Sequence, residues 1–157
     1  RGPQDSGLVV GKKEWIDRCR RYGPPKDGVC RGCKTSREAI VGLYKAVQQY
    51  LGQDEAAELR RLNARCARFE RTLRECGFSR IMRTQEGPVG QQMPRTYGVM
   101  PYGSAEKLAE KMRGEGIYIG AEPDNRILLN PLMVAPSQVK TVCDALMRCM
   151  QQIKEEH

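Results

Sequence analysis

Residues 54–77 read DEAAELRRLNARCARFERTLRECG, and the apolar pattern in this stretch decides how the chain folds. The apolar residues recur at spacings of three and four, which is the period of one face of an α-helix. They are Leu59, Leu62, Cys66, Phe69, Leu73 and Cys76. Asp54 is a good N-terminal cap, and Gly77 is typical of the residue that follows a helix end. The pattern predicts a helix with one buried stripe. A coiled coil is the weaker alternative, because fewer than three full heptads are present.

The sequence after this helix predicts a small sheet and two more helices. The strand candidates are 78–84, 95–100, 117–119 and 126–129. Residues 104–113 predict a short helix with Leu108 and Met112 inward, and Ser137 is expected to cap a final helix. The inward face of that final helix is expected to hold Val139, Val142, Cys143, Leu146, Met150 and Ile153. This order of elements predicts an α/β fold, in which helices cover one side of a small, mostly antiparallel sheet.

A further helix is predicted immediately before residue 54. Thr35 and Glu38 have the spacing of a capping box, and Gly52 marks the helix end. Between them, apolar residues recur at helical spacing and predict a buried face on a helix over 36–51. These residues are Ile40, Leu43, Tyr44, Val47 and Leu51.

The first 34 residues predict a strand, a helix and a loop. Residues 8–10 read as a short buried strand, because three apolar residues stand between glycines. Residues 12–22 predict a helix with Trp15, Ile16 and Cys19 on one face. Residues 23–34 are rich in Gly and Pro and predict a loop.

Composition limits the class of protein. Of the 157 residues, 39% are hydrophobic and 29% charged, which suits one domain-sized core and is too apolar for a disordered chain. No apolar run reaches the ~18 residues of a membrane span, and no signal peptide is recognisable. Seven cysteines, four of them at apolar helical positions, favour a reducing, cytoplasmic compartment. Because the chain begins at Arg1 rather than Met, we expect a piece of a longer protein.

Positive charge is concentrated at the N-terminal end. Residues 1–37 hold ten Lys and Arg against four acids, so they carry +6 of the net charge of +8. This favours an anionic partner such as a phosphate, a carboxylate or RNA, with a solvated surface as the alternative. Arg31 and Lys34 lie directly before the predicted helix, where cations and free backbone N–H groups suit an anion. A plain basic loop without a ligand is the alternative for these two residues.

Cys30-Arg-Gly-Cys33 is a C-x-x-C motif, which could bind zinc or act as a redox pair. A structural zinc needs four ligands, and the sequence has neither a second C-x-x-C nor a histidine other than His157. A pair of loop thiols without a role is therefore the simplest interpretation. His157 is also the last residue, which argues against self-contained Ser-His-Asp or Cys-His catalysis.

Three stretches together resemble a known family. They are GPQDSGLVVGKK (2–13), RGCKTSREAIVGL (31–43) and GIYIG (116–120) leading into ILLNP (127–131). They resemble the C-terminal half of pyridoxal-phosphate enzymes of the bacterial selenocysteine synthase type (L-seryl-tRNA(Sec) selenium transferase). The related D-glucosaminate-6-phosphate ammonia-lyases are more similar still. The resemblance runs along nearly the whole chain, in order.

This resemblance implies a fold type I architecture. Residues 1–35 would finish the large cofactor domain with its last strand and helix, and 36–52 would be an interdomain helix. Residues 53–157 would form the C-terminal small domain. The chain would then be part of a pyridoxal-phosphate-dependent lyase or transferase acting on an amino-acid-like substrate, and a homo-oligomer is expected.

The resemblance also assigns roles to residues. Arg31 and Lys34 would bind the anionic groups of the substrate, although Cys30 and Cys33 depart from the usual pattern around them. The turn beside the cofactor would be Gly2, Pro3 and Gln4. The lysine that forms the Schiff base would lie upstream of Arg1, so we expect no catalytic residue and no metal ligand in this chain, which would be inactive alone.

Two other functions fit the residues. An RNA-binding or scaffolding domain with the same fold would hold tRNA through its basic N-terminal quarter, and its affinity would fall steeply with salt. A stand-alone redox or metal protein would be built on the C-x-x-C motif.

Overall fold

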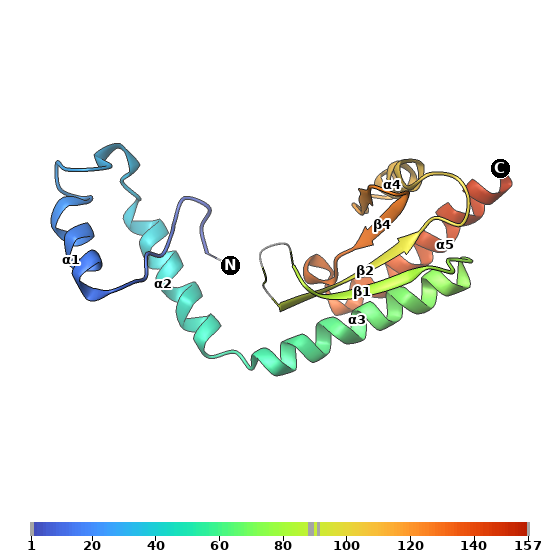
Figure 1. Cartoon of the computed structure of the whole chain (residues 1–157), viewed down its shortest axis with the longest axis horizontal. Helices are drawn as coiled ribbons and strands as arrows, with labels where there is room; N and C mark the ends of the chain where they lie inside the picture. Colours follow the sequence, from blue (N-terminus) through green and yellow to red (C-terminus); the bar gives the residue numbers. More distant parts are fainter. Residues whose placement is uncertain (1, 88–89, 91, 157) are drawn as a thin grey trace. The chain divides into compact units, whose positions relative to one another are not determined.

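The computed structural model describes residues 2–87, 90 and 92–156. The chain divides into two compact units, Arg1–Gln53 and Asp54–His157, and the elements of each are drawn in Figure 1. None of the helices in the described part is both long and apolar enough to cross a membrane. The assignment of 1–35, 36–52 and 53–157 to parts of a larger enzyme stays a prediction.

The second unit is an antiparallel sheet with helices packed against it. Its helices are α3 (Glu55–Glu75), α4 (Ala105–Gly114) and α5 (Val139–Glu155). Its strands are β1 (Ile81–Glu86), β2 (Gln92–Val99), β3 (Gly120–Glu122) and β4 (Arg126–Leu129). The four strands lie in the order β1-β2-β4-β3, and every neighbouring pair is antiparallel. The predicted α/β class and the predicted order of elements are confirmed.

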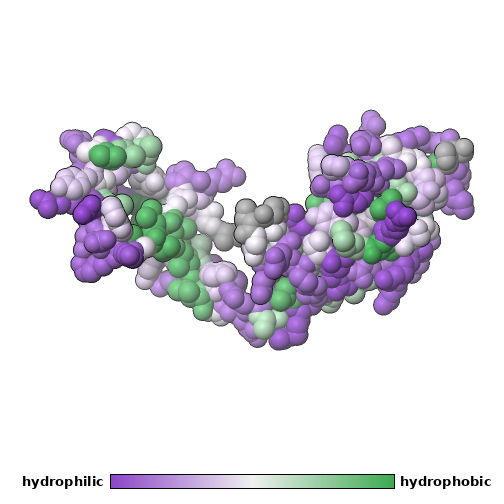
Figure 2. Space-filling view, in the orientation of Figure 1, coloured by the Kyte–Doolittle hydropathy of each residue, from purple (hydrophilic) through white to green (hydrophobic). Residues whose placement is uncertain are grey.

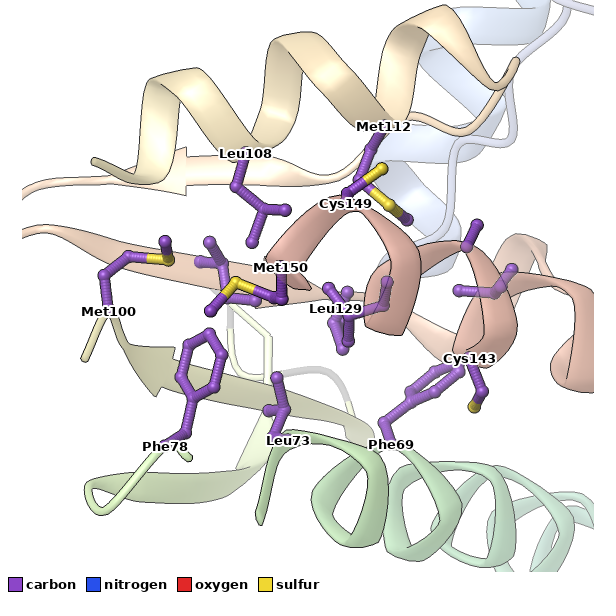
Figure 3. Close-up of a cluster of buried hydrophobic side chains, with 14 of the residues drawn as sticks. Phe69, Leu73, Phe78, Met100, Leu108, Met112, Leu129, Cys143, Cys149 and Met150 are labelled. Atoms are coloured by element: carbon purple, nitrogen blue, oxygen red, sulfur yellow. The ribbon is translucent and has the colours of Figure 1, made fainter. Parts of the chain in front are cut away.

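One hydrophobic core joins the sheet to its helices (Figure 3). Phe69 and Leu73 on α3 and Leu108 and Met112 on α4 are buried, as the helical spacing predicts. The predicted face of α5 is also confirmed, with Val139 partly buried at its start. The buried residues of that face are Val142, Cys143, Leu146, Met150 and Ile153.

Both ends of α3 lie where the sequence predicts them. The carboxylate of Asp54 accepts the N–H of Ala57 at 2.9 Å. At the other end, Gly77 takes a φ of +88°, which favours glycine. There the N–H of Gly77 bonds to the Arg74 carbonyl and that of Phe78 to the Leu73 carbonyl, both at 3.0 Å. This is a Schellman motif, which satisfies carbonyls that the helix end leaves free.

Two strands begin later than predicted, for one shared reason. β1 starts at Ile81 rather than at 78. β3 starts at Gly120, after the whole of the predicted strand 117–119, which is therefore wrong in its bounds. In each case the first predicted strand residue closes the preceding helix. Ile117 donates its N–H to the Met112 carbonyl at 2.9 Å, as Phe78 does at the end of α3. An N–H that ends a helix is not free for a sheet.

The predicted cap of α5 is wrong. Ser137 lies inside a 3-10 turn, Pro136–Gln138, and the helix begins at Val139. Proline suits the first position of such a turn because its φ is fixed and it has no N–H to leave unpaired. The turn is closed by Gln138, whose side-chain oxygen accepts the N–H of Ala135 at 3.0 Å.

The first unit has two α-helices among its described residues. They are α1 (Lys13–Tyr22) and α2 (Arg37–Leu51), joined by a loop with a 3-10 turn at Arg31–Cys33. Both predicted helices are confirmed, but the predicted capping box is wrong. The cap is Ser36, one residue later than Thr35, and its hydroxyl accepts the N–H of Ala39 at 3.1 Å.

The predicted burial in this unit is wrong. Residues 8–10 form no strand, and the side chains of Leu8, Val9 and Val10 are exposed. Trp15, for which the sequence predicts only a place on one face of α1, is exposed. On α2 only Ala39 is buried, whereas Tyr44 is 64% exposed. The periodicity therefore predicts the helix correctly. Among the described residues, no other helix or sheet packs over its apolar face.

Truncation of a core methionine should destabilise the second unit. Met150 is 1% exposed and lies among the buried side chains of the core (Figure 3). Met133, on the same unit, is 75% exposed. Met150→Ala leaves a cavity and should cost about 2–5 kcal/mol of unfolding free energy. Met133→Ala should stay within about 0.5 kcal/mol. Urea unfolding of both variants measures this, and equal losses would contradict the assigned core.

Glu156 gives a prediction about acid. Lys107 and Lys111 on α4 donate to its carboxylate and lower its pKa from 4.5 to about 2. Because the folded pKa is lower than the unfolded one, this pair of contacts stabilises the fold above about pH 4.5 and is lost as pH falls toward 2. Glu156→Gln should therefore lose less stability over that range than the wild type does. The neighbouring Glu155→Gln is the control in pH-dependent urea unfolding, and an equal effect in both variants would refute the assignment.

Candidate functional site

A cavity of about 880 Å³ lies within the first unit, between the N-terminal segment, the loop and the first turns of α2. Its wall is largely apolar, with Lys34, Thr35 and Arg37 at the end where α2 begins. The lining residues are Ser6, Gly7, Leu8, Pro24, Pro25, Cys33, Lys34, Thr35, Arg37, Ile40, Leu43, Tyr44 and Val47. Apolar pockets with a few convergent polar groups are the usual form of a small-molecule site.

Close packing holds the N-terminal segment against α2. A Cβ on Gly42 would lie 2.8 Å from Pro3 Cγ, so Pro3 reaches the helix because residue 42 has no side chain. A Cβ on Gly2 would lie 3.0 Å from Leu43 Cδ1. The Ser6 hydroxyl then donates to the Pro3 carbonyl at 2.5 Å, which turns the chain back along the cavity. Two of the stretches that carry the family resemblance are thus in contact.

Gly2 and Pro3 support the cavity rather than line it. Of the described residues, Ser6 to Leu8 are the part of this segment on the cavity wall. Gln4 lies in an exposed turn between the two. Whether Gly2, Pro3 and Gln4 lie beside a cofactor stays a prediction.

Lys34 and Arg37 place two positive charges at the N-terminus of α2. Both line the cavity, one before and one after the cap Ser36. This end of a helix carries a partial positive charge, so cations there are unfavourable unless an anion is near. Among the described residues neither side chain makes an ion pair. The arrangement is therefore chemically suited to a phosphate or carboxylate, which N–H groups and cations would bind together.

Arg31 is placed differently from Lys34. Its Nε donates to Asp27 Oδ1 at 2.9 Å across the loop, and its side chain is 44% exposed. In the described part of the chain it is not a lining residue of the cavity. Reaching an anion in the cavity would require Arg31 to leave Asp27. The sequence groups the two cations together, but the structure brings only Lys34 to the wall.

Sequence reasoning missed two residues of this site. Arg37 was counted among the cations near the N-terminus but not assigned to a site. Its position directly after Ser36 could have identified it as a cation at the first position of the helix. Tyr44 was assigned to a buried face, whereas it lines the cavity and its hydroxyl accepts a hydrogen bond from Gln48 at 3.0 Å. The spacing that predicts a buried helix face also fits an open apolar wall.

The thiols fall into two groups. Cys19, Cys30 and Cys33 are exposed and free, and Cys33 lines the cavity. The others belong to the second unit, where burial raises the pKa of Cys76 to about 11. Burial also raises the pKa of Cys66 and Cys149. These three thiols are buried or half-buried and their raised pKa keeps them protonated near neutral pH.

Three other candidate features are a metal site, His157 and a second pocket. Within the described residues, no three His, Cys, Asp or Glu side chains cluster in a way that could hold a metal ion. His157 lies outside those residues. A shallower pocket of about 410 Å³ lies on the sheet beside Tyr97, with the Arg126 guanidinium 5.9 Å from the ring centre.

Comparison with families of known proteins found no match to any family model, and no curated protein matches the chain.

The cavity predicts a difference between Lys34 and Arg31. Lys34→Ala removes a cation from the wall and should weaken the binding of inorganic phosphate about tenfold, the effect of one charge-assisted hydrogen bond. Arg31→Ala removes an equal charge outside the wall and should change binding less than about twofold. Isothermal titration of both variants measures this. Equal weakening would mean that phosphate responds only to the net charge of the loop.

Proposed function

We propose that this chain is the C-terminal part of a pyridoxal-phosphate-dependent lyase or transferase of the selenocysteine synthase type. In this proposal the cavity in residues 1–53 receives the anionic group of an amino-acid-like substrate. The second unit is then the C-terminal small domain, and α2 is the helix that joins it to the cofactor domain.

One observation carries the proposal. Gly2 and Pro3 belong to one motif of the resemblance and pack against Leu43 and Gly42, which belong to another. Lys34 and Arg37, of that second motif, line the adjoining cavity at the start of the same helix. A chance likeness between two short stretches gives no reason for them to pack together beside one cavity. The fold of the second unit is compatible with the proposal, but a four-stranded sheet with packed helices is not specific to this family.

The donor set of the cavity fits the substrate side of such a site. Lysine and arginine side chains, the hydroxyl of Thr35 and the start of α2 all suit a phosphate or carboxylate. When bound, pyridoxal phosphate supplies an electron sink that lets a bond at the substrate α-carbon break. In the proposal this chain binds and orients the anion, and the lysine that holds the cofactor lies before residue 1.

The lysines near this site support that division of roles. A lysine that attaches the cofactor needs a desolvated amine. Lys13 is 89% exposed at its side chain and pairs with Asp17. Lys34 lines the cavity but stands beside Arg37, in a position suited to an anion.

The exposed apolar surface of the first unit also supports the proposal. Figure 2 shows apolar residues gathered over α2 in green. Exposed side chains there include Ile40, Val41 and Leu51, and Leu8 to Val10 lie uncovered near the cavity. Contiguous apolar surface of this kind marks an interface. In the proposal the upstream cofactor domain or a second subunit covers it.

The experiment uses the longer protein from its natural source. That protein should contain pyridoxal phosphate, and borohydride should fix the cofactor on a lysine a few residues before Gly2. Peptide mass spectrometry identifies the labelled lysine. The 157-residue chain, treated identically, is the control and should show no single labelled lysine, because in the proposal the lysine that holds the cofactor lies before residue 1.

Two results would refute the proposal. One is a longer protein whose region before Gly2 contains no lysine or that binds no cofactor. The other is efficient, specific labelling of one lysine in the isolated chain.

RNA binding remains the second candidate, and α1 favours it. Arg18 stacks on the exposed Trp15 at 4.7 Å, and Lys13, Arg20 and Arg21 add positive charge to the same short helix. An exposed aromatic ring stacked by an arginine, on a positively charged helix, is typical of single-strand binding. Tight binding of tRNA that weakens steeply with salt, in a longer protein without cofactor, would favour this function over the proposed one.

A further inference from the structure

The C-x-x-C motif lies on a tight turn that neither the fold nor the proposed function explains. Cys30 precedes the 3-10 turn Arg31–Cys33, and the N–H of Cys33 bonds to the Cys30 carbonyl at 2.9 Å. Cys30 takes a φ of 61°, which few residues other than glycine adopt. The chain therefore folds back sharply between the two cysteines.

The turn brings the two cysteines within the range of a disulfide. A hydrogen bond from residue i+3 to residue i closes a turn in which the two Cα atoms lie within about 7 Å. Disulfides join Cα atoms that are about 4.4–6.8 Å apart. The bond therefore needs adjustment of the loop and no movement of α1 or α2.

Access favours the same pair. Cys30 and Cys33 are both exposed and free, so a small oxidant or reductant in solution can reach them. Cys19, the third exposed thiol, belongs to α1 rather than to this turn. The thiols of the second unit are buried or half-buried in its core.

We propose that Cys30 and Cys33 form a reversible disulfide across this turn. This modification site requires neither the cofactor nor the substrate of the proposed function, so the two can fail separately.

The reaction is exchange with a small disulfide, such as oxidised glutathione. One cysteine sulfur attacks the small disulfide, which forms a mixed disulfide and releases one small thiol. The second cysteine then attacks the protein sulfur of that bond, which forms the Cys30–Cys33 bond and releases the second small thiol. The two cysteines lose two protons and two electrons, and the small disulfide accepts both.

The closed ring would contain Arg31 and adjoin the cavity. Cys33 lies on the cavity wall next to Lys34, and Arg31 stands between the two sulfurs in sequence. The bond would thus restrict the backbone from which both cations project. The oxidation state of the loop and occupation of the cavity would then affect each other.

Trypsin gives a direct test, because it cleaves after Lys26, Arg31 and Lys34. The 157-residue chain is equilibrated with oxidised and reduced glutathione, its remaining thiols are alkylated, and it is digested without reductant. Peptides 27–31 and 32–34 should remain joined by a disulfide and separate when a reductant is added. In fully reduced protein each should appear alone and alkylated.

Single variants show whether the second thiol resolves the first. In Cys33→Ser or Cys30→Ser, glutathione should remain bound to the other cysteine at least about tenfold more than in the wild type, because the neighbouring thiol has a high effective concentration. Cys19→Ser is the control and should leave the linked peptides unchanged.

Two outcomes would overturn the proposal. The first is wild-type protein that carries glutathione on Cys30 and Cys33 as extensively as the variants do. The second is a bond from either cysteine to Cys19 or to another chain in place of the linked peptides.

Discussion

The reversal of the chain at Gly77 is the constraint on which the second unit depends. Gly77 adopts the left-handed conformation, and the N–H of Phe78 bonds back to Leu73. The ring of Phe78 is then directed against β2, where a Cβ on Gly98 would lie only 2.7 Å from Phe78 Cδ1. Two glycines therefore allow the contact between the Phe78 ring and β2. Gly77 turns the chain, and Gly98 leaves space for the ring. From this contact β1 starts along β2, and the buried stripe of α3 faces the sheet.

The same argument explains why α2 and α3 behave differently. Both have apolar residues at helical spacing, but the stripe on α3 has a sheet and α5 against it. In the part of the chain that the structure describes, the stripe on α2 has the short N-terminal segment packed against it and remains largely exposed. Burying apolar area is what stabilises a helix of this kind in a protein. A helix that keeps an uncovered stripe therefore needs an additional surface. This physical need agrees with the proposed place of α2 between two domains.

The sequence alone was sufficient for the helices of both units and for the order of helices and strands after residue 54, because period and turn residues are local signals. It wrongly predicted a strand over 8–10. The sequence was not sufficient for the strand boundaries at 78 and 117. It does not show whether the N–H of such a residue bonds to the end of a helix or to a neighbouring strand. The prediction of a buried face on α2 failed for a different reason. Burial depends on which other parts of the protein pack against the helix, and the sequence of the helix does not show this. Within the site, charge and position identified Lys34. The pairing of Arg31 with Asp27 depends on the backbone of an irregular loop, which no periodicity predicts.

The charges around the start of α2 differ from those of an ordinary helix end, as the proposed anion site requires. Ser36 caps the helix in the usual way, but Lys34 and Arg37 add cations where the helix already carries partial positive charge. Each such placement costs about 0.3–1 kcal/mol at an exposed helix end. Glu38 is the acid in the first turn, whereas Asp27 is hydrogen-bonded to Arg31. Local rules are broken in this way mainly where function requires it. A bound anion would reverse the sign of the interaction, so that the groups that destabilise the empty cavity would hold its ligand.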